Sequence, residues 1–135
     1  MSDPKNAIEH IGLVVADSKA MARWYETALG FMVLNAFDTD NGHVAFIKCS
    51  RTGLIFELIT NRTLAPIEGV LTHPLQLHIA FKSEDINKDR DRLTALGAVF
   101  VTDCPTKDPA ARVLIVKDPW GNFIQLAQRK GDFYL

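Results

Sequence analysis

Four polar residues recur in this sequence at a spacing that could place them around one metal ion. His78 lies 68 residues after His10, and Gln125 lies 68 residues after Glu57. Imidazole nitrogens, carboxylates and amide oxygens are all donors used for divalent transition metals. A duplicated unit with one polar residue near its start and one near its end supplies four donors, which symmetric pairing of the units would bring together. The spacing therefore predicts a metal site, or the remains of one.

The elements that must position these residues follow the same period. Each unit reads as a strand, a helix and three further strands, which indicates an α+β fold of two tandem βαβββ units. The first helix is expected to begin at Asp17 or Ser18 and the second at Ser83 or Asp85, each ending before a glycine. A single domain is expected over residues 7–129, with unit one at about 7–60, a linker at about 61–74 and unit two at about 75–129.

Both histidines share a predicted strand face with a small residue. Side chains alternate along a strand, so Gly12 falls on the face of His10 and Ala80 on the face of His78. The other face of each strand carries bulky aliphatic residues suited to packing beneath a helix. The histidine side chains are therefore expected to point into a cavity on the face of the sheet opposite to the helix, and not into the core. A hydrogen-bonded histidine on a half-buried strand is the alternative.

Glu57 lies in the apolar run Leu54-Ile-Phe-Glu-Leu-Ile59. An ionised carboxylate in such surroundings costs several kcal/mol unless it is paired or bound to a metal. This favours Glu57 as a metal ligand, although an edge strand that turns Glu57 toward water would explain it as well. With His10 and His78 it makes a set of two histidines and one carboxylate, which suits Zn²⁺, Ni²⁺, Co²⁺, Mn²⁺ or Fe²⁺ with positions left open for a substrate.

Composition limits the classes of function. The chain has 135 residues, 47% hydrophobic and 23% charged, with a formal net charge of −1. No run of Lys and Arg indicates nucleic-acid binding. A membrane span needs about 20 consecutive apolar residues, and no stretch of the sequence is that long and apolar. Its two cysteines, Cys49 and Cys104, are isolated and are expected to be reduced, so a cytoplasmic location is expected.

Several stretches in register with the repeat resemble the vicinal oxygen chelate superfamily, the group of glyoxalase I, bleomycin-resistance proteins and extradiol dioxygenases. Together they cover about residues 7–129 and are specific for the superfamily, though not for one activity in it. The matching stretches are His10-Ile-Gly-Leu-Val-Val15, Trp24-Tyr25 followed by Leu29-Gly30-Phe31, Phe56-Glu57-Leu58, His78-Ile-Ala-Phe81 and Asp118-Pro-Trp-Gly-Asn-Phe-Ile-Gln-Leu126.

The resemblance implies a curved, mostly antiparallel eight-stranded sheet around a cavity that holds a metal ion and a small molecule. It also implies a homodimer, because units from one chain or from two can pair in this superfamily. His10, Glu57, His78 and Gln125 occupy the expected ligand positions. The leading hypothesis is a glyoxalase-I-like lyase or isomerase that acts on a small molecule with vicinal oxygens.

Gln125 departs from the usual pattern, because the last strand of glyoxalase-like members commonly carries a Glu that can act as a base. A neutral amide can offer its oxygen to a metal but cannot take up a proton near neutral pH. Glu57 is then the one candidate among the four for the catalytic base. A ligand-binding protein of the bleomycin-resistance type is the main alternative. Extradiol cleavage is disfavoured, because Ile115 and Gln125 stand where those members carry Tyr and Glu.

Four further residues are candidates for contact with a substrate: Phe46, Arg112, Leu114 and Trp120. Arg112 could bind a carboxylate or phosphate through a bidentate contact, and the other three could wall the cavity. A rim arginine and ordinary core or loop packing would explain them equally well. The C-terminal Phe133-Tyr134-Leu135 could cover a cavity or a dimer edge, or fray.

Overall fold

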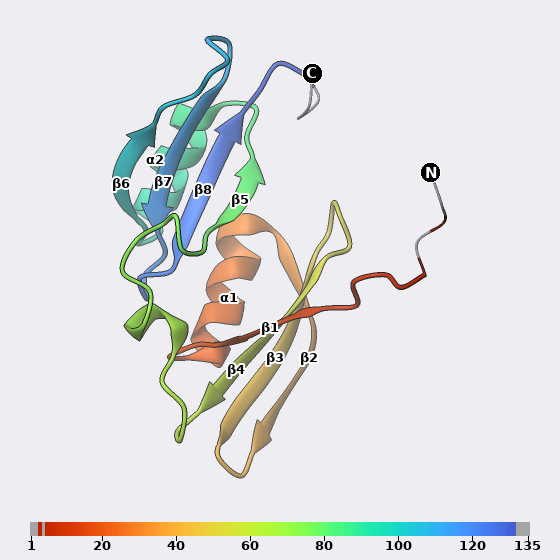
Figure 1. The fold of residues 1–135 in the computed structure, drawn as a ribbon. Helices are drawn as coiled ribbons and strands as arrows, with labels where there is room; N and C mark the ends of the chain where they lie inside the picture. Colours follow the sequence, from red (N-terminus) through yellow and green to blue (C-terminus); the bar gives the residue numbers. More distant parts are fainter. Residues whose placement is uncertain (1–2, 4, 132–135) are drawn as a thin grey trace. The chain divides into compact units, whose positions relative to one another are not determined.

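A computed structural model shows the fold of the chain and describes residue 3 and residues 5–131; the C-terminal Phe133, Tyr134 and Leu135 lie outside the described part. The chain divides into two compact units, one ending at Val70 and the other beginning at Leu71. Figure 1 shows a strand, a helix and three further strands in each unit. None of the helices in the described part is long and apolar enough to span a membrane.

Unit 1 is a four-stranded sheet with a helix packed against it. The sheet has the order β1-β4-β3-β2, in which β1 and β4 are parallel and the other neighbours are antiparallel. The helix contacts β2, β3 and β4. The elements of unit 1 are β1 (Ile11–Val14), α1 (Ser18–Leu29), β2 (Phe31–Thr39), β3 (Gly42–Cys49), β4 (Ile55–Asn61) and a short 3-10 helix, η1 (Ile67–Gly69).

Helix α1 begins and ends where its flanking residues satisfy the free backbone groups. Asp17 is the N-cap, and its carboxylate accepts a hydrogen bond from the backbone N–H of Ala20 at 3.0 Å. Gly30 ends the helix in the left-handed conformation, φ 71°, which glycine adopts without steric cost. Met21 and Tyr25 lie on the buried face, each 2% exposed. Burial of this face against the sheet stabilises the helix more than local propensity does.

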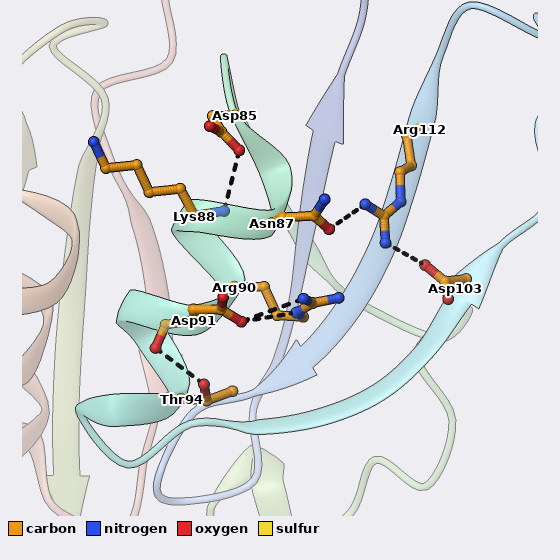
Figure 2. Close-up of polar contacts among 8 residues, drawn as sticks. All are labelled: Asp85, Asn87, Lys88, Arg90, Asp91, Thr94, Asp103 and Arg112. Atoms are coloured by element: carbon orange, nitrogen blue, oxygen red, sulfur yellow. Dashed lines mark hydrogen bonds and ion pairs between the residues drawn. The ribbon is translucent and has the colours of Figure 1, made fainter.

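Unit 2 repeats the plan. Its sheet has the order β5-β8-β7-β6, with β5 and β8 parallel and the other neighbours antiparallel. Asp85 caps the helix by accepting from the backbone N–H of Lys88 at 3.1 Å, a contact drawn in Figure 2, and Ile86 and Leu93 are buried. The elements of unit 2 are β5 (Ile79–Lys82), α2 (Ile86–Ala95), β6 (Val99–Cys104), β7 (Arg112–Lys117) and β8 (Phe123–Gln128).

The predicted α+β class and the two βαβββ units are confirmed. The eight strands hydrogen-bond as two four-stranded sheets, one in each unit, and each sheet contains one parallel pair. The β1 and β5 ladders begin at Ile11 and Ile79, so each histidine stands one residue before its strand rather than within it. Each histidine therefore lies at the end of the sheet where its strand begins.

Candidate functional site

Unit 1 brings together two of the predicted metal ligands, His10 and Glu57. Parallel pairing of β1 with β4 sets Gly12 opposite Glu57, and antiparallel pairing of β3 with β4 sets Phe46 opposite Glu57. The Nε2 atom of His10 lies 3.5 Å from Oε1 of Glu57. The ring of Phe46 meets the His10 ring edge-on, with 5.7 Å between centroids. The register of three strands thus gathers one imidazole, one carboxylate and one aromatic wall.

Gly12 keeps the space above Glu57 open. A Cβ at residue 12 would stand 3.5 Å from Glu57 Oε1, an ordinary contact, so a small side chain fits there and a long one would cover the carboxylate. The neighbours of Glu57 on β4, Phe56 and Leu58, point the other way and are 3% and 1% exposed. Glu57 itself is 24% exposed. Alternation along β4 therefore separates the partly exposed face that carries Glu57 from the apolar core beneath α1.

The ring of His10 is oriented by its neighbour in the chain. The Nδ1 atom of His10 lies 2.9 Å from Oε1 of Glu9. An ionised carboxylate only accepts hydrogen bonds, so Nδ1 must carry the proton. In the neutral imidazole this leaves the lone pair of Nε2 pointing toward Glu57, the tautomer in which Nε2 can bind a metal.

Unit 2 holds the other two predicted ligands, His78 and Gln125. The β5–β8 pairing sets Ala80 opposite Gln125, the same register that sets Gly12 opposite Glu57. The Nδ1 atom of His78 lies 2.7 Å from the carbonyl oxygen of Pro74. A carbonyl oxygen can only accept, so the lone pair of this imidazole also belongs to Nε2.

His78 and Gln125 line a hollow of about 680 Å³ in unit 2. Its floor includes Val113 and Ile115 of β7, and its rim comes from the loops that precede β5 and follow β6. Ile115 stands opposite Gln125 and is 2% exposed. The rim adds charged residues, among them Asp103, Lys107 and Arg129, and a hollow of this size is typical of a small-molecule site.

Of the four residues predicted to contact a substrate, Phe46 is the one that lies beside the candidate ligands. Arg112 is engaged elsewhere, as Figure 2 shows: it donates to the side-chain oxygen of Asn87 on α2 and to Asp103 on β6, the latter at 3.4 Å. Arg112 and Ile115 have opposite parity on β7, so the guanidinium lies on the helix side of the sheet.

Leu114 and Trp120 also lie apart from the hollow. Leu114 is 0% exposed and pairs with Leu126, so the structure places it in the core, one residue away from the wall residue Ile115. Trp120 is in the turn between β7 and β8, where its backbone N–H donates to the Asp118 carboxylate at 3.0 Å. The described residues that line the hollow include neither of them.

The two cysteines are free thiols in different settings. Cys104 lines the hollow, where burial raises its pKa and the charge of Asp103 raises it further. Burial also pushes the pKa of Cys49 upward. Hydrogen bonds from Thr52 and the positive charge of Arg51 outweigh that effect and hold the pKa of Cys49 below its usual value.

The donors present fit a divalent transition metal. Two ligand atoms about 2.1 Å from a tetrahedral metal ion are about 3.4 Å apart, and His10 Nε2 and Glu57 Oε1 are separated by 3.5 Å. Unit 2 contributes the imidazole of His78 and the amide oxygen of Gln125, which such ions also accept. Among residues 3 and 5–131, no three His, Cys, Asp or Glu side chains form a ready metal cluster. The candidate donors therefore stand as a pair in each unit.

Glu9 and Pro74, the acceptors for the two imidazoles, were not predicted from the sequence. They occupy different places in the repeat, since the equivalent of Glu9 is Leu77 and that of Pro74 is Asn6. Periodicity therefore gave no signal for either. The adjacency of an acid to a candidate ligand histidine was the one available clue for Glu9.

Solved structures of similar fold come from several bacteria. A glyoxalase family protein from Bacillus cereus has a TM-score of 0.68 and 20% identity, covering 96% of this chain and 100% of that chain. The fosfomycin resistance protein FosX from Listeria monocytogenes, complexed with Mn(II) and sulfate, has a TM-score of 0.70 and 18% identity, covering 93% and 91%. TnmS3, an antibiotic binding protein from a Streptomyces species, has a TM-score of 0.61 and 23% identity, covering 93% and 99%. At these identities the likeness shows the fold alone.

The sequence itself carries the family assignment. No curated protein matches it. The family model described as the Glyoxalase/Bleomycin resistance protein/Dioxygenase superfamily matches residues 7–126, which span both units and all four candidate ligands. The chain therefore belongs to the Glyoxalase/Bleomycin resistance protein/Dioxygenase superfamily.

Proposed function

We propose that this protein is a metal-dependent, glyoxalase-I-like lyase or isomerase that acts on a small molecule with vicinal oxygens. His10, Glu57, His78 and Gln125 would hold one divalent ion of Zn, Ni, Co, Mn or Fe. Because each unit carries two of the four donors, a complete site needs both units. These come from one chain or from the two chains of a homodimer.

The observation that carries the metal proposal is the His10–Glu57 pair. Glu9 holds the proton of His10 on Nδ1, so a lone pair of Nε2 and an anionic oxygen of Glu57 face each other at 3.5 Å. Two electron-rich atoms at this distance repel unless a positive charge lies between them. A proton could supply that charge, but a metal ion supplies it at a spacing that matches the donor separation.

The residues divide the chemistry between the two units. A bound metal would act as a Lewis acid on the substrate's oxygens and stabilise negative charge that develops there. Glu57 is the proposed base: it has two oxygens, so one can face the metal while the other takes a proton from the substrate carbon. Gln125 orients the substrate or the ion through its neutral amide and leaves proton transfer to Glu57.

The hollow of unit 2 supports a small-molecule substrate. Its walls at Val113 and Ile115 are apolar, whereas His78 and Gln125 present polar atoms to the same space. Phe46 is the proposed wall in unit 1, because it stands opposite Glu57 as Ile115 stands opposite Gln125. Two proteins of similar fold, FosX and TnmS3, are a fosfomycin resistance protein and an antibiotic binding protein.

Metal analysis of protein purified without a chelator or an affinity tag tests the proposal directly. We expect about one transition-metal ion per complete set of four donors, with loss of the ion in His10→Ala. His73→Ala is the matched control, since it removes a histidine that lies outside the proposed ligand set. Absence of metal in the wild type, together with no uptake of Zn²⁺, Ni²⁺, Co²⁺, Mn²⁺ or Fe²⁺, would contradict the proposal.

Exchange of carbon-bound protons tests the chemistry. Metal-loaded protein is incubated with hydroxyacetone in D₂O, and loss of the C–H signals beside the carbonyl is followed by NMR. We expect exchange that depends on both the metal and Glu57. Consumption of oxygen by the Fe²⁺-loaded protein, without exchange, would indicate an oxygenase instead.

A binding protein without catalysis is the second candidate. The hollow of unit 2 and the replacement of the usual Glu by Gln125 favour it. In that case a compound found by thermal-shift screening would bind with equal affinity to the wild type and to Glu57→Ala, although the variant has lost its metal. Dependence of binding on Glu57 would favour the enzyme.

A further inference from the structure

We propose that Glu9 is a positioning residue, which fixes the tautomer and ring orientation of His10 so that Nε2 is presented toward Glu57. This inference rests on the proposed function for its consequence, metal affinity. Its geometric basis is independent of any metal. The carboxylate of Glu9 stands 2.9 Å from His10 Nδ1, on the side of the ring opposite to Glu57.

The hydrogen bond decides which nitrogen is available. A neutral imidazole has one N–H and one lone pair, and a free histidine interconverts between its two tautomers. An acceptor at Nδ1 selects the form with the proton on Nδ1. Histidines that bind metals generally donate the other ring N–H to a carboxylate or a backbone carbonyl, which fixes the ring and raises the basicity of the binding nitrogen.

The other unit meets the same requirement with a different group. His78 stands 68 residues after His10, and its Nδ1 is held by the Pro74 carbonyl at 2.7 Å. The position equivalent to Glu9 in unit 2 holds Leu77, and the position equivalent to Pro74 in unit 1 holds Asn6. Neither of these two residues is the acceptor. The two units use different acceptors, yet in both of them Nδ1 is hydrogen-bonded and Nε2 is the nitrogen that keeps its lone pair. This agreement indicates that the orientation matters to the site rather than being a local accident.

The two acceptors differ in charge and in exposure. Glu9 adds a negative charge next to His10, whereas the Pro74 carbonyl is neutral. The Glu9 side chain is 88% exposed, so water competes for it and its contribution is limited. Removal of an outer-shell partner typically lowers metal affinity 10- to 100-fold, and for this exposed carboxylate we expect about threefold to tenfold.

The test combines two measurements on four proteins: the wild type, Glu9→Ala, Glu9→Gln and, as a control, Glu26→Ala. The control removes an exposed acid from α1 of the same unit. The first measurement is the imidazole ¹⁵N NMR spectrum of metal-free protein at pH about 8.5, well above the ordinary histidine pKa. The second is the affinity for Zn²⁺ and Co²⁺, measured by competition with a chromophoric chelator.

We expect His10 to carry its proton on Nδ1 in the wild type and to become a tautomer mixture in Glu9→Ala. Metal affinity should fall in Glu9→Ala, fall less in Glu9→Gln, whose amide oxygen still accepts, and stay unchanged in Glu26→Ala. A wild-type proton on Nε2, an unchanged tautomer in Glu9→Ala, or a changed tautomer with unchanged affinity would each overturn the proposal. If the wild type binds no metal but the tautomer shifts as expected, the proposed function fails and the positioning of His10 by Glu9 stands.

Discussion

The starts of the two helices show what the two units have kept in common. Asp17 caps α1 and Asp85 caps α2, 68 residues later. The next N–H of each helix is also satisfied from the last strand of its own unit. Ser18 donates to Thr60 Oγ1 at 2.7 Å, and Ile86 donates to Gln128 Oε1 at 2.8 Å. Thr60 and Gln128 differ chemically, so the requirement that persists is an acceptor for an otherwise unpaired N–H.

Arg112 takes part in this shared framework. It pairs with Gln128, as His43 pairs with Thr60, so the two residues are equivalents across the repeat. His43 Nδ1 lies 2.8 Å from the buried Ser18 hydroxyl, and Arg112 donates to Asn87 of α2. Both side chains tie the third strand of the unit to the start of its helix. A charged residue that the sequence suggests as a substrate contact can thus connect a strand to a helix instead.

The open faces of the two sheets show where the units have diverged. Glu57 and Gln125 occupy equivalent positions, and Phe46 and Ile115 stand opposite them. Unit 1 therefore carries an anionic group beside an aromatic ring, whereas unit 2 carries a neutral amide at a hollow lined by both apolar and polar residues. The same backbone register supports different chemistry, because side chains on the open face need not fill a core.

Glu57→Gln removes this asymmetry by giving both units an amide, and should have the largest effect. Loss of the only acidic candidate ligand should weaken metal binding and abolish the proposed base, lowering proton exchange about 10²- to 10⁴-fold. Exchange of hydroxyacetone protons in D₂O measures it, with Glu26→Gln as a control at an exposed acid. Full activity in Glu57→Gln would show that the base lies elsewhere.

Gln125→Glu removes the asymmetry in the opposite direction. A second carboxylate should bind a divalent cation more tightly by Coulomb attraction, with a gain of about tenfold or more for charges a few ångströms apart. Chelator competition with Zn²⁺ measures the gain. A decrease in affinity would mean that Gln125 does not face the metal, and the same residue would then be assigned to ligand contact alone.

Arg112→Met tests the division between framework and site, and its expected effect is smaller. The pair with Asp103 is partly exposed, so its loss together with the Asn87 contact should cost about 0.5–1 kcal/mol of unfolding free energy. Methionine keeps much of the aliphatic packing of arginine. Urea unfolding measures the cost, and metal affinity should not change. A loss of substrate binding with unchanged stability would show that Arg112 contacts the substrate.

The two thiols provide the mildest contrast between the units. The pKa of Cys49 is lowered and that of Cys104 is raised, so at pH about 7.5 Cys49 holds the larger thiolate fraction and should alkylate faster. The single variants Cys49→Ser and Cys104→Ser each leave one thiol for rate measurements with iodoacetamide. The difference should shrink as the pH approaches 9, because both thiols then ionise. Equal rates at pH about 7.5 would contradict the assignment.

Much of this protein follows from local patterns along the chain. The 68-residue period predicts two equivalent units, and Asp17, Asp85, Gly30 and Gly97 mark the helix limits that the structure shows. Alternation along β1 and the residue before it predicts that His10 and Gly12 share a face, because the side-chain repeat of extended backbone is a local property. The family follows from motifs that match it, and the four candidate ligands follow from the same 68-residue period.

Other features were decided only by tertiary structure. The turn from β7 to β8 is closed by a hydrogen bond from Asp118 N–H to the Asn122 carbonyl, and this turn determines that Ile115, not Leu114, stands opposite Gln125. A shift of one residue in a register moves every side chain to the other face, so Leu114 and Arg112 could not be assigned from β7 alone. Likewise, Pro74 reaches His78 only through the path of a loop. Sequence period determines which residues are equivalent, whereas strand register and loop path determine which atoms meet.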